Sequence, residues 1–336
     1  MITDARALQD DYIPHDLRHR EGQIDALASS LQPMARGLTG EDVFIFGPSG
    51  SGKTTLAKYV ADQLEQETLA LRRGYVNCIS DPTPTAVLST LVRDAGLGAR
   101  RPDGTPRGYY LDVLRDGLGP DDQLLAIVDE CDVLGDFELL RALYAIEGVT
   151  IVAISVSEDD LFSAADLQSQ TRSRLRSFEV LRLQSYSHSE MADILDYRVE
   201  HGLDRERVAD GVIDYVADHA SGNARDGIAL LRRAARRART ESCDITLDLV
   251  ADVRADARAH VREQRVRTLG THQRTLYEII RDREEVTGED LHAAYEERVQ
   301  DPRGKRRRRQ YLDALERYDL VEQRGHGRAA SYRLLD

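Results

Sequence analysis

The sequence predicts an α/β domain built on a parallel sheet, then a helical domain, then a winged helix. Three observations predict this order. Short runs rich in Val, Ile and Leu alternate with helical patterns in the first half, helices alone follow, and three helices with two short strands end the chain. A length of 336 residues favours two or three domains. We expect their limits at 1–186, 187–266 and 267–336.

In the first domain, five buried strands are expected at 41–46, 74–78, 124–130, 149–155 and 178–183. A helix at 21–30 precedes them, and further helices separate them. Strands that are apolar along their whole length and separated by helices indicate a parallel sheet covered on both faces. From residue 187 to about 266 the pattern is helical throughout. The third region has three helical segments and then two short strands around the turn at 325–327, which is the pattern of a winged helix.

Composition favours a globular chain of the cytoplasm. Hydrophobic residues make up 41% and charged residues 31%, no apolar run is long enough for a membrane helix, and the first residues lack the pattern of a secretory signal. We therefore expect no membrane partner. The net charge is −13, and only three of the 46 basic residues are Lys. This bias resembles proteins of salt-loving archaea, in which local basic clusters, here 232–239 and 303–309, say more about partners than overall charge.

A phosphate-binding loop is expected between the first strand and the helix after it. Its pattern is complete and comprises Gly47, Pro48, Ser49, Gly50, Ser51, Gly52, Lys53 and Thr54. Backbone N–H groups of such a loop surround phosphates, and the helix that Thr55 opens adds its positive end. Lys53 is expected on the β- and γ-phosphates and Thr54 on Mg²⁺, so ATP or ADP with Mg²⁺ is the expected ligand. The alternative is a chance glycine loop before a helix.

Two carboxylates at the end of the third expected strand supply the second part of such a site. Asp129 is expected to hold the water shell of Mg²⁺, and Glu130 to orient the attacking water. The alternative is an acidic strand end in an acidic protein. The neighbouring Asp132 is expected to serve as a cap or to face solvent.

The third helix of the winged helix begins with a basic run and is expected to enter the major groove of double-stranded DNA. Residues 301–336 carry ten Lys and Arg against six Asp and Glu, the reverse of the whole chain. We expect Lys305, Arg306 and Arg307 on phosphates and Arg308, Arg309 or Gln310 on base edges. The wing is expected to contribute Arg324, His326 and Arg328. The alternative is a basic surface that only faces solvent between domains.

With these motifs in order, nearly the whole chain resembles the archaeal replication initiators related to the eukaryotic origin recognition complex and its Cdc loader, which are AAA+ ATPases. Three segments add to the resemblance: 12–14 with Leu17 and 19–21, the stretch between the second and third strands, and 222–225. The resemblance implies that Tyr12, Ile13 and Pro14 help enclose adenine. It also implies that the stretch before the third strand contacts DNA, and that Arg225 reaches the γ-phosphate from a lid.

Two positions depart from the family pattern. Val156 stands where an asparagine that positions water is expected, which favours slow hydrolysis. Gln170 stands where one of several arginines is expected, while Arg172, Arg174 and Arg176 are present. We expect Arg174 to be the finger offered to a neighbouring subunit's nucleotide, the alternative being a basic helix end.

These expectations together predict an ATP-dependent initiator that binds origin duplex DNA in the nucleoid, assembles on it and helps load the replicative helicase. An accessory paralogue that regulates replication or repair is an alternative, which Val156 favours. Two further alternatives are a DNA-binding regulator in which ATP is structural, and a clamp-loader-like machine that acts only in a ring.

Overall fold

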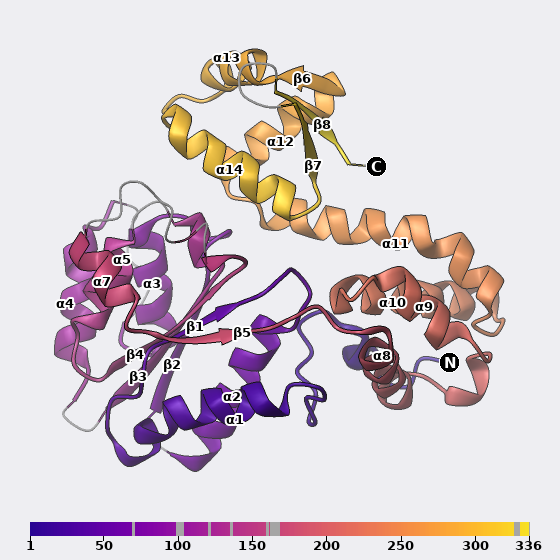
Figure 1. The fold of residues 1–336 in the computed structure, drawn as a ribbon, viewed down its shortest axis with the longest axis horizontal. Coiled ribbons are helices and arrows are strands. Elements are labelled where there is room, and N and C mark those ends of the chain that lie inside the picture. Colours follow the sequence, from indigo (N-terminus) through magenta and orange to yellow (C-terminus); the bar gives the residue numbers. More distant parts are fainter. Residues whose placement is uncertain are drawn as a thin grey trace.

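The computed structural model describes residues 1–68, 71–98, 104–119, 122–134, 137–158, 161, 169–325 and 330–335, and within these it describes the backbone alone at 169–170 and 255–261. Three units follow one another along the chain (Figure 1). We call them the sheet unit, the helical unit and the C-terminal unit. The described helices include none that is long and apolar enough to cross a membrane.

The sheet unit contains five parallel strands in the order β2-β3-β4-β1-β5, which confirms the predicted fold class. The strands are β1 (Val43–Phe46), β2 (Leu71–Asn77), β3 (Gln123–Asp129), β4 (Val149–Ser155) and β5 (Glu179–Arg182). The strand order reverses beside β1, and ligands of such sheets bind at the carboxyl ends of the strands near this reversal. This edge of the sheet is where the predicted phosphate loop begins.

Helices cover both faces of the sheet, because alternate residues of each central strand pack on opposite sides. Val43 and Ile45 of β1 pack into one buried cluster with α1 and α2, whereas Phe44 and Phe46 pack into another. The helices of this unit are α1 (Glu21–Leu31), α2 (Lys53–Glu67), α3 (Pro84–Asp94), α4 (Arg107–Gly117), α5 (Glu138–Tyr144) and α7 (Ser169–Leu175). Two short 3₁₀ helices, η2 (Gln32–Arg36) and η3 (Cys131–Val133), accompany them, whereas η1 (Ala5–Leu8) packs on the helical unit.

The helical unit comprises α8 (His188–Gly202), η4 (Arg205–Arg207), α9 (Val212–Ala220), α10 (Ala224–Glu241) and α11 (Leu247–Thr268). Side chains of Ser187, Asn223 and Thr246 cap α8, α10 and α11, as expected of these residue types at helix N-termini. The N-terminal residues, which the predicted limits grouped with the sheet, pack on this unit: Ile2 bridges to Leu203, and Leu8 belongs to its core. Figure 1 shows the N-terminus beside α8.

The C-terminal unit is a winged helix. It contains α12 (Thr271–Arg283), β6 (Glu285–Thr287), α13 (Gly288–Arg298), α14 (Lys305–Arg317), β7 (Val321–Arg324) and β8 (Ser331–Leu334). The antiparallel sheet has the order β6-β8-β7. Three helices and the final hairpin agree with the prediction. The third strand, β6, has only three residues, too few for a period-two pattern to predict it.

Candidate functional site

The loop from Gly47 to Gly52 joins β1 to the N-terminus of α2, as the motif predicts. Gly50 and Gly52 adopt positive φ angles of 74° and 91°. A Cβ atom at Gly50 would lie 1.9 Å from Asn223 Oδ1, and one at Gly52 would lie 2.6 Å from the Tyr186 hydroxyl. Both conformation and space therefore require glycine at these two positions.

Lys53 lies inside the loop that precedes it. Its amine donates hydrogen bonds to the carbonyls of Gly47 (2.6 Å) and Pro48 (2.9 Å), and the residue is 6% exposed. Burial is the main reason why the pKa of Lys53 is below its usual value, and the nearby carboxylates of Glu130 and Asp129 oppose this effect. An anionic ligand would replace the two carbonyls as the partner of this buried cation.

Asp129 lies directly behind the loop and connects α2 to the sheet. Its Oδ2 accepts hydrogen bonds from the hydroxyls of Thr54 (2.8 Å) and Tyr75 (2.9 Å). Its Oδ1 is buried and has no hydrogen-bond partner among the described residues. The described residues contain no group of three or more His, Cys, Asp and Glu that could hold a metal ion. The buried oxygen beside a threonine hydroxyl nevertheless suits Mg²⁺, which binds through few protein oxygens and retains water.

Glu130, the next residue, has a left-handed backbone (φ 55°) that turns the chain away from β3. Burial, together with the charges of Asp129 and Asp132, raises the pKa of Glu130 to about 7. The nearby Lys53 amine and the side chain of Tyr318 partly offset this rise. A carboxyl group with a pKa near neutrality suits a base that takes up a proton during the reaction.

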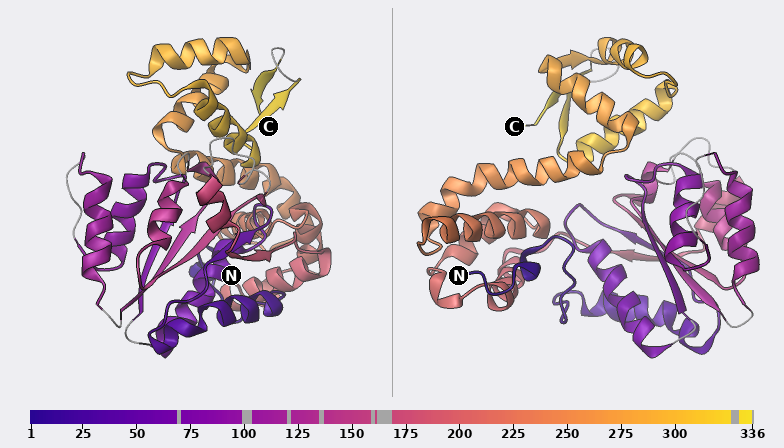
Figure 2. Two further views of the ribbon diagram at one scale, coloured as in Figure 1. Left: turned by 60° about the vertical axis from the view of Figure 1, so that its left-hand side comes forward. Right: turned by 180° about the vertical axis from the view of Figure 1, so that it is seen from behind.

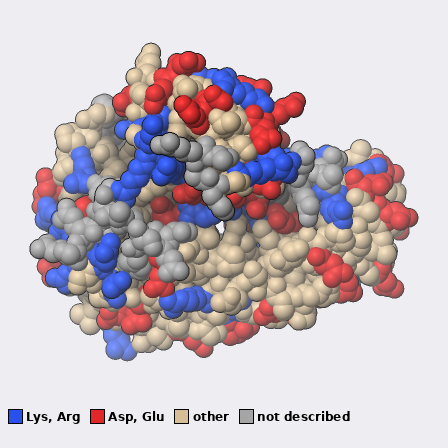
Figure 3. Space-filling model, turned by 45° about the horizontal axis from the view of Figure 1, so that its top comes forward, with Lys and Arg blue, Asp and Glu red and all other residues tan. Residues whose placement is uncertain are grey.

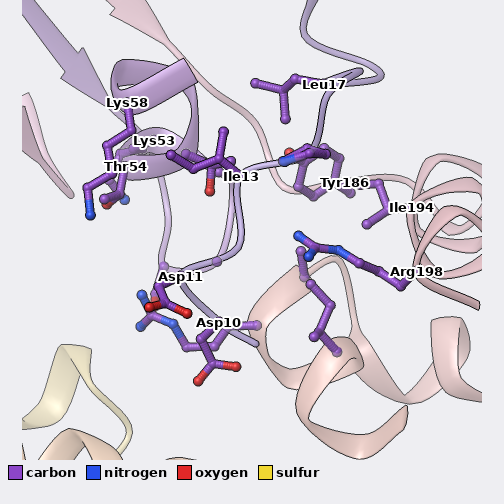
Figure 4. Close-up of a pocket in the computed structure, with 18 of the residues that line it drawn as sticks. Asp10, Asp11, Ile13, Leu17, Lys53, Thr54, Lys58, Tyr186, Ile194 and Arg198 are labelled. Carbon is purple, nitrogen blue, oxygen red and sulfur yellow. The ribbon is translucent and has the colours of Figure 1, made fainter. Parts of the chain in front are cut away.

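A cavity of about 300 Å³ opens beside this loop, between the sheet unit and the helical unit. In Figure 4, Lys53, Thr54 and Lys58 lie on one side, and Tyr186, Ile194 and Arg198 lie on the other. The predicted residues that line this cavity are Ile13, Pro14, Ser49, Gly50, Gly52, Lys53, Thr54, Thr55, Asp129, Glu130 and Arg225.

The structure corrects the place expected for Tyr12. Its ring lies under the Arg198 guanidinium, 4.8 Å from that group, and the residue is not among those that line the cavity. Ile13 and Pro14 do line it, together with Leu17. Residues on both sides of Tyr12 therefore line the cavity, including Asp10 and Asp11 before it, whereas Tyr12 itself does not.

Sequence reasoning missed the wall that the helical unit provides. Ile194 and Arg198 of α8 and Ile228 of α10 line the cavity, and so does Tyr186 before α8. One signal was present: Arg198 follows Met191 and Leu195 at helical spacing, so it lies on the buried face of α8. A buried arginine needs partners, and Arg198 donates to the carbonyls of Ala7 (2.8 Å) and Tyr12 (3.3 Å).

Arg20 supports the loop from behind. Its guanidinium donates to the carbonyls of Ser51 (3.0 and 3.3 Å) and Gln184 (2.9 Å) and lies 3.9 Å from the ring centre of Tyr186. Ser51 itself is fully buried. The resemblance singled out Arg20 as part of the N-terminal arm, and the structure gives this residue a positioning role.

The N-terminus of α10 touches the phosphate loop directly. The N–H of Ala224 donates to the carbonyl of Gly50 (3.1 Å), and Asn223 lies over Gly50. Arg225, the next residue, therefore lies on the wall of the same cavity as Lys53. The Ala224–Gly50 hydrogen bond therefore joins the helical unit to the loop at the point where phosphates would lie.

Of the two positions that depart from the family pattern, the structure describes Val156 in full and Gln170 by its backbone alone, and Arg174 lies close to Gln170 in sequence. Val156 comes directly after β4, and the Ser155 hydroxyl before it donates to Asp132 (3.0 Å). Arg174 is exposed on α7, with its guanidinium 5.3 Å from the ring centre of Tyr144, and it does not line its own chain's cavity. That location is compatible with a role in a neighbouring subunit.

The basic run at the start of α14 divides into two sets. Lys305, Arg306 and Arg309 are exposed, whereas Arg308 is 2% exposed. Arg308 pairs with Glu296 (2.7 Å) and donates to the carbonyl of His292 (3.2 Å). The expectation that Arg308 contacts a base edge is therefore wrong in this structure, because its guanidinium is committed inside the unit.

Arg307 is half-buried and donates to the Tyr311 hydroxyl (3.3 Å) and the carbonyl of Pro82 (3.4 Å). On the wing, Arg324 is exposed and lies 3.5 Å from Glu322. His326 and Arg328 lie outside the described residues. In Figure 3, Lys and Arg side chains gather in patches near the C-terminal unit, interspersed with Asp and Glu.

Comparisons with known proteins agree with this architecture. Residues 40–158 match the family model of an AAA domain, and residues 192–259 match that of the Cdc6 AAA+ ATPase-type lid domain. In structure, the chain is similar to the Aeropyrum pernix ORC1 protein in complex with DNA. The TM-score is 0.75 and the identity 24%, with 99% of this chain and 93% of that chain covered.

Two curated relatives come from Halobacterium salinarum. ORC1-type DNA replication protein 9 is 34% identical, with 100% of this chain and 94% of the relative covered. ORC1-type DNA replication protein 1 is 37% identical, with 91% of this chain and 99% of the relative covered. With this degree of identity over the full length, and with the phosphate loop, lid and winged helix in the same order, the chain belongs to the ORC1-type DNA replication proteins.

Proposed function

We propose that this chain is an ATP-dependent initiator that binds origin duplex DNA and helps load the replicative helicase. The observation that carries the proposal is the contact between the N-terminus of α10 and the phosphate loop, which places Arg225 of the lid and Lys53 of the loop on one cavity. A nucleoside triphosphate held there would fix the lid to the sheet unit, because the side chains of Lys53 and Arg225 would both bind its phosphates.

Each residue of the cavity has a distinct task in this proposal. Lys53 leaves the carbonyls of Gly47 and Pro48 and binds phosphate oxygens, while backbone N–H groups of the loop surround the same phosphates. Thr54 and Asp129 would hold Mg²⁺, which supplies charge neutralisation when bound. Glu130, whose pKa is raised to about 7, orients the attacking water and accepts its proton.

Binding of the base is assigned to the apolar part of the cavity. Ile13, Leu17, Ile194 and Ile228 line it, and these side chains give a flat aromatic base a surface from which water is excluded. Ile194 and Ile228 come from the helical unit, and Ile13 and Leu17 come from the segment before α1, so the folded lid completes this surface.

The proposed DNA contacts lie on α14 and the wing. Lys305, Arg306 and Arg309 present exposed cations on one helix, and Arg324 adds one from β7. Phosphate contacts of this kind orient a winged helix on duplex DNA. The Aeropyrum pernix ORC1 protein, whose fold this chain shares, is seen in complex with DNA. Association with the nucleoid follows from such binding, and Arg174 is the proposed contact to a neighbouring subunit during assembly on DNA.

Crosslinking of the tagged protein to DNA in growing cells, followed by sequencing of the recovered fragments, tests the proposal. We expect sharp occupancy at one or a few replication start regions. The triple variant K305A/R306A/R309A should lose these peaks at unchanged protein level. Peaks scattered over the genome or linked to promoters would contradict the initiator assignment.

An accessory paralogue is the second candidate, and the position of Val156 favours it. Valine has no hydrogen-bonding side chain, and the hydroxyl of the preceding Ser155 already donates to Asp132. Slow turnover of ATP would follow. The crosslinking experiment separates the two candidates, because the paralogue predicts occupancy away from replication start regions.

A further inference from the structure

The three helices of the C-terminal unit meet in a polar cluster close to the start of α14. His272 of α12 contacts Tyr295 of α13 and Tyr311 of α14. The rings of His272 and Tyr311 lie nearly parallel, at an angle of 6° and with 6.1 Å between their centres. Tyr295 and Tyr311 are buried, whereas Arg303, between α13 and α14, has a side chain that is 44% exposed. A buried aromatic cluster therefore supports an exposed arginine.

Two hydrogen bonds fix Arg303 on this cluster. Its backbone N–H donates to the Tyr295 hydroxyl (3.2 Å), and its side-chain Nε donates to His272 Nε2 (3.2 Å). His272 Nδ1 in turn lies 2.7 Å from the Tyr295 hydroxyl oxygen. Main chain and side chain of Arg303 are thus both held by residues of the packed helices.

The arginine determines the tautomer of His272. A guanidinium only donates hydrogen bonds, so Nε2 must be an unprotonated acceptor, and the proton of the neutral ring is on Nδ1, facing the Tyr295 hydroxyl. Burial and then the charge of Arg303 hold the pKa of His272 below its usual value of 6.5, which agrees with a neutral ring. The other titratable and charged groups around this ring are Tyr295, Asp301, Arg307 and Tyr311.

The anchor of Arg303 uses its inner nitrogen and leaves the two terminal nitrogens for another partner. Nη1 lies 3.8 Å from Asp301, whose side chain is 88% exposed, and an exposed ion pair of this length contributes little and exchanges readily. The terminal nitrogens of arginine form a planar fork that matches the oxygens of a phosphate. Arg303 also lies two residues before Lys305, the first of the exposed cations of α14.

We propose, on the basis of the duplex binding proposed above, that Arg303 contacts a phosphate of bound DNA and that His272 is its positioning residue. A side chain that is already held in one orientation loses less conformational freedom on binding, so the anchor increases affinity without touching DNA itself. The DNA-binding surface then begins before α14, in the segment that joins it to α13.

Fluorescence anisotropy of the full-length protein with a labelled duplex of mixed sequence, over a salt series, tests this contact. Arg303→Ala should reduce the slope of log affinity against log salt by about 0.9, so its deficit should grow about eightfold for each tenfold dilution of salt. Arg281→Ala, which removes an exposed arginine from the last turn of α12, is the control and should bind like the wild type.

Variants of His272 test the positioning role. His272→Phe keeps a flat ring beside Tyr311 but offers no acceptor to Arg303, and it should weaken duplex binding about threefold. His272→Gln retains an acceptor and should bind like the wild type. The double variant R303A/H272F should bind no more weakly than Arg303→Ala, because His272 acts only through Arg303. Additive losses would overturn the positioning role.

A readout without DNA uses the protein labelled with ¹⁵N in its histidines. Nuclear magnetic resonance should show the Nδ1–H tautomer for His272, whose signal is identified by its absence from His272→Gln. Its pKa should rise toward 6.5 in Arg303→Ala, because the arginine no longer opposes protonation. A pKa that this substitution leaves unchanged would show that the two side chains are not paired and would overturn the positioning role.

The outcomes separate this inference from the proposed function. A wild type that binds duplex DNA while Arg303→Ala keeps its salt slope overturns the Arg303 contact alone. A wild type that binds no duplex DNA contradicts the proposed function and the contact together.

Discussion

The phosphate loop and the basic start of α14 are both conspicuous runs in the sequence, yet they differ in how far their sequence predicts their geometry. Every residue of the loop lies where the motif places it, between β1 and α2. The basic run keeps its helix, but Arg308 turns inward and Arg307 is half-buried, so only Lys305, Arg306 and Arg309 are exposed.

The difference arises from what each motif specifies. A phosphate loop is specified through its backbone, because glycines at fixed positions permit one chain path and the N–H groups follow that path. A basic run on a helix specifies only composition. Its consecutive side chains point about 100° apart, so at least one of five must face the core of a packed helix.

The largest effect is expected at the loop. Replacement of Lys53 by Ala should weaken ATP binding about 100-fold or more, because a buried charge-assisted contact with phosphate is lost. Titration with a fluorescent ATP analogue measures this change. Lys305→Ala, one of the other two lysines, is the control and should bind ATP like the wild type. Unchanged affinity in Lys53→Ala would remove the nucleotide site from this loop.

The two sets of arginines on α14 should respond in opposite ways. Arg308→Ala should lower the free energy of unfolding by about 2 kcal/mol, because it breaks an ion pair that is buried on the arginine side and half-exposed at Glu296. Arg309→Ala should leave stability within about 0.5 kcal/mol of the wild type.

Duplex binding should show the reverse order. Arg309→Ala should weaken binding and reduce the slope of log affinity against log salt by about 0.9, as expected for one lost phosphate contact. Urea denaturation and fluorescence anisotropy over a salt series measure the two effects. Equal behaviour of the two variants would mean that the division of this helix into buried and exposed sets is wrong.

A smaller effect concerns Asp42, which supports the strand that carries the loop. Asp42 accepts a hydrogen bond from the Ile151 N–H (2.7 Å), and burial raises its pKa from 3.8 to about 6. The protonated form of Asp42 is favoured in the folded state. The contribution of Asp42 to the free energy of unfolding is therefore present below about pH 4 and is lost as pH rises through about 6.

Asp42→Asn keeps an acceptor for Ile151 and cannot ionise. The free energy of unfolding of Asp42→Asn should be close to that of the wild type at pH 4 and should exceed it by roughly 1–2 kcal/mol at pH 7.5. Urea denaturation at constant salt across this range measures it. A difference that does not vary with pH would show that folding does not shift the pKa of Asp42.

Much of the fold was predictable because its signals are local. The predicted strand at 149–155 coincides with β4, and the other four strands differ from prediction by one to three residues at their ends. Runs of Val, Ile and Leu that are buried on both faces give a strong signal, whereas the ends depend on hydrogen bonds to distant segments.

The parts of the site that escaped prediction depend on contacts between distant segments. Tyr318 and Glu130 line one cavity although about 190 positions of sequence separate them, and no local pattern distinguishes Tyr318 from an ordinary core tyrosine. For Arg198 the helical spacing indicates a buried position, but its partners, which are backbone carbonyls of the N-terminal arm, are far away in sequence. These residues were missing from the predicted site because their contact partners lie far away in sequence, where local patterns carry no signal.

The continuous helix α11 determines how motion in one half of the molecule reaches the other. It runs unbroken for 22 residues from the helical unit to the C-terminal unit, as Figure 2 shows, which corresponds to a rod of about 33 Å. A rod of this length acts as a lever arm. A tilt of about 10° at the lid end would move the winged helix by roughly 6 Å, which is more than the pitch of one helical turn. A small adjustment around a phosphate thereby becomes a displacement large enough to change the register of the protein on DNA.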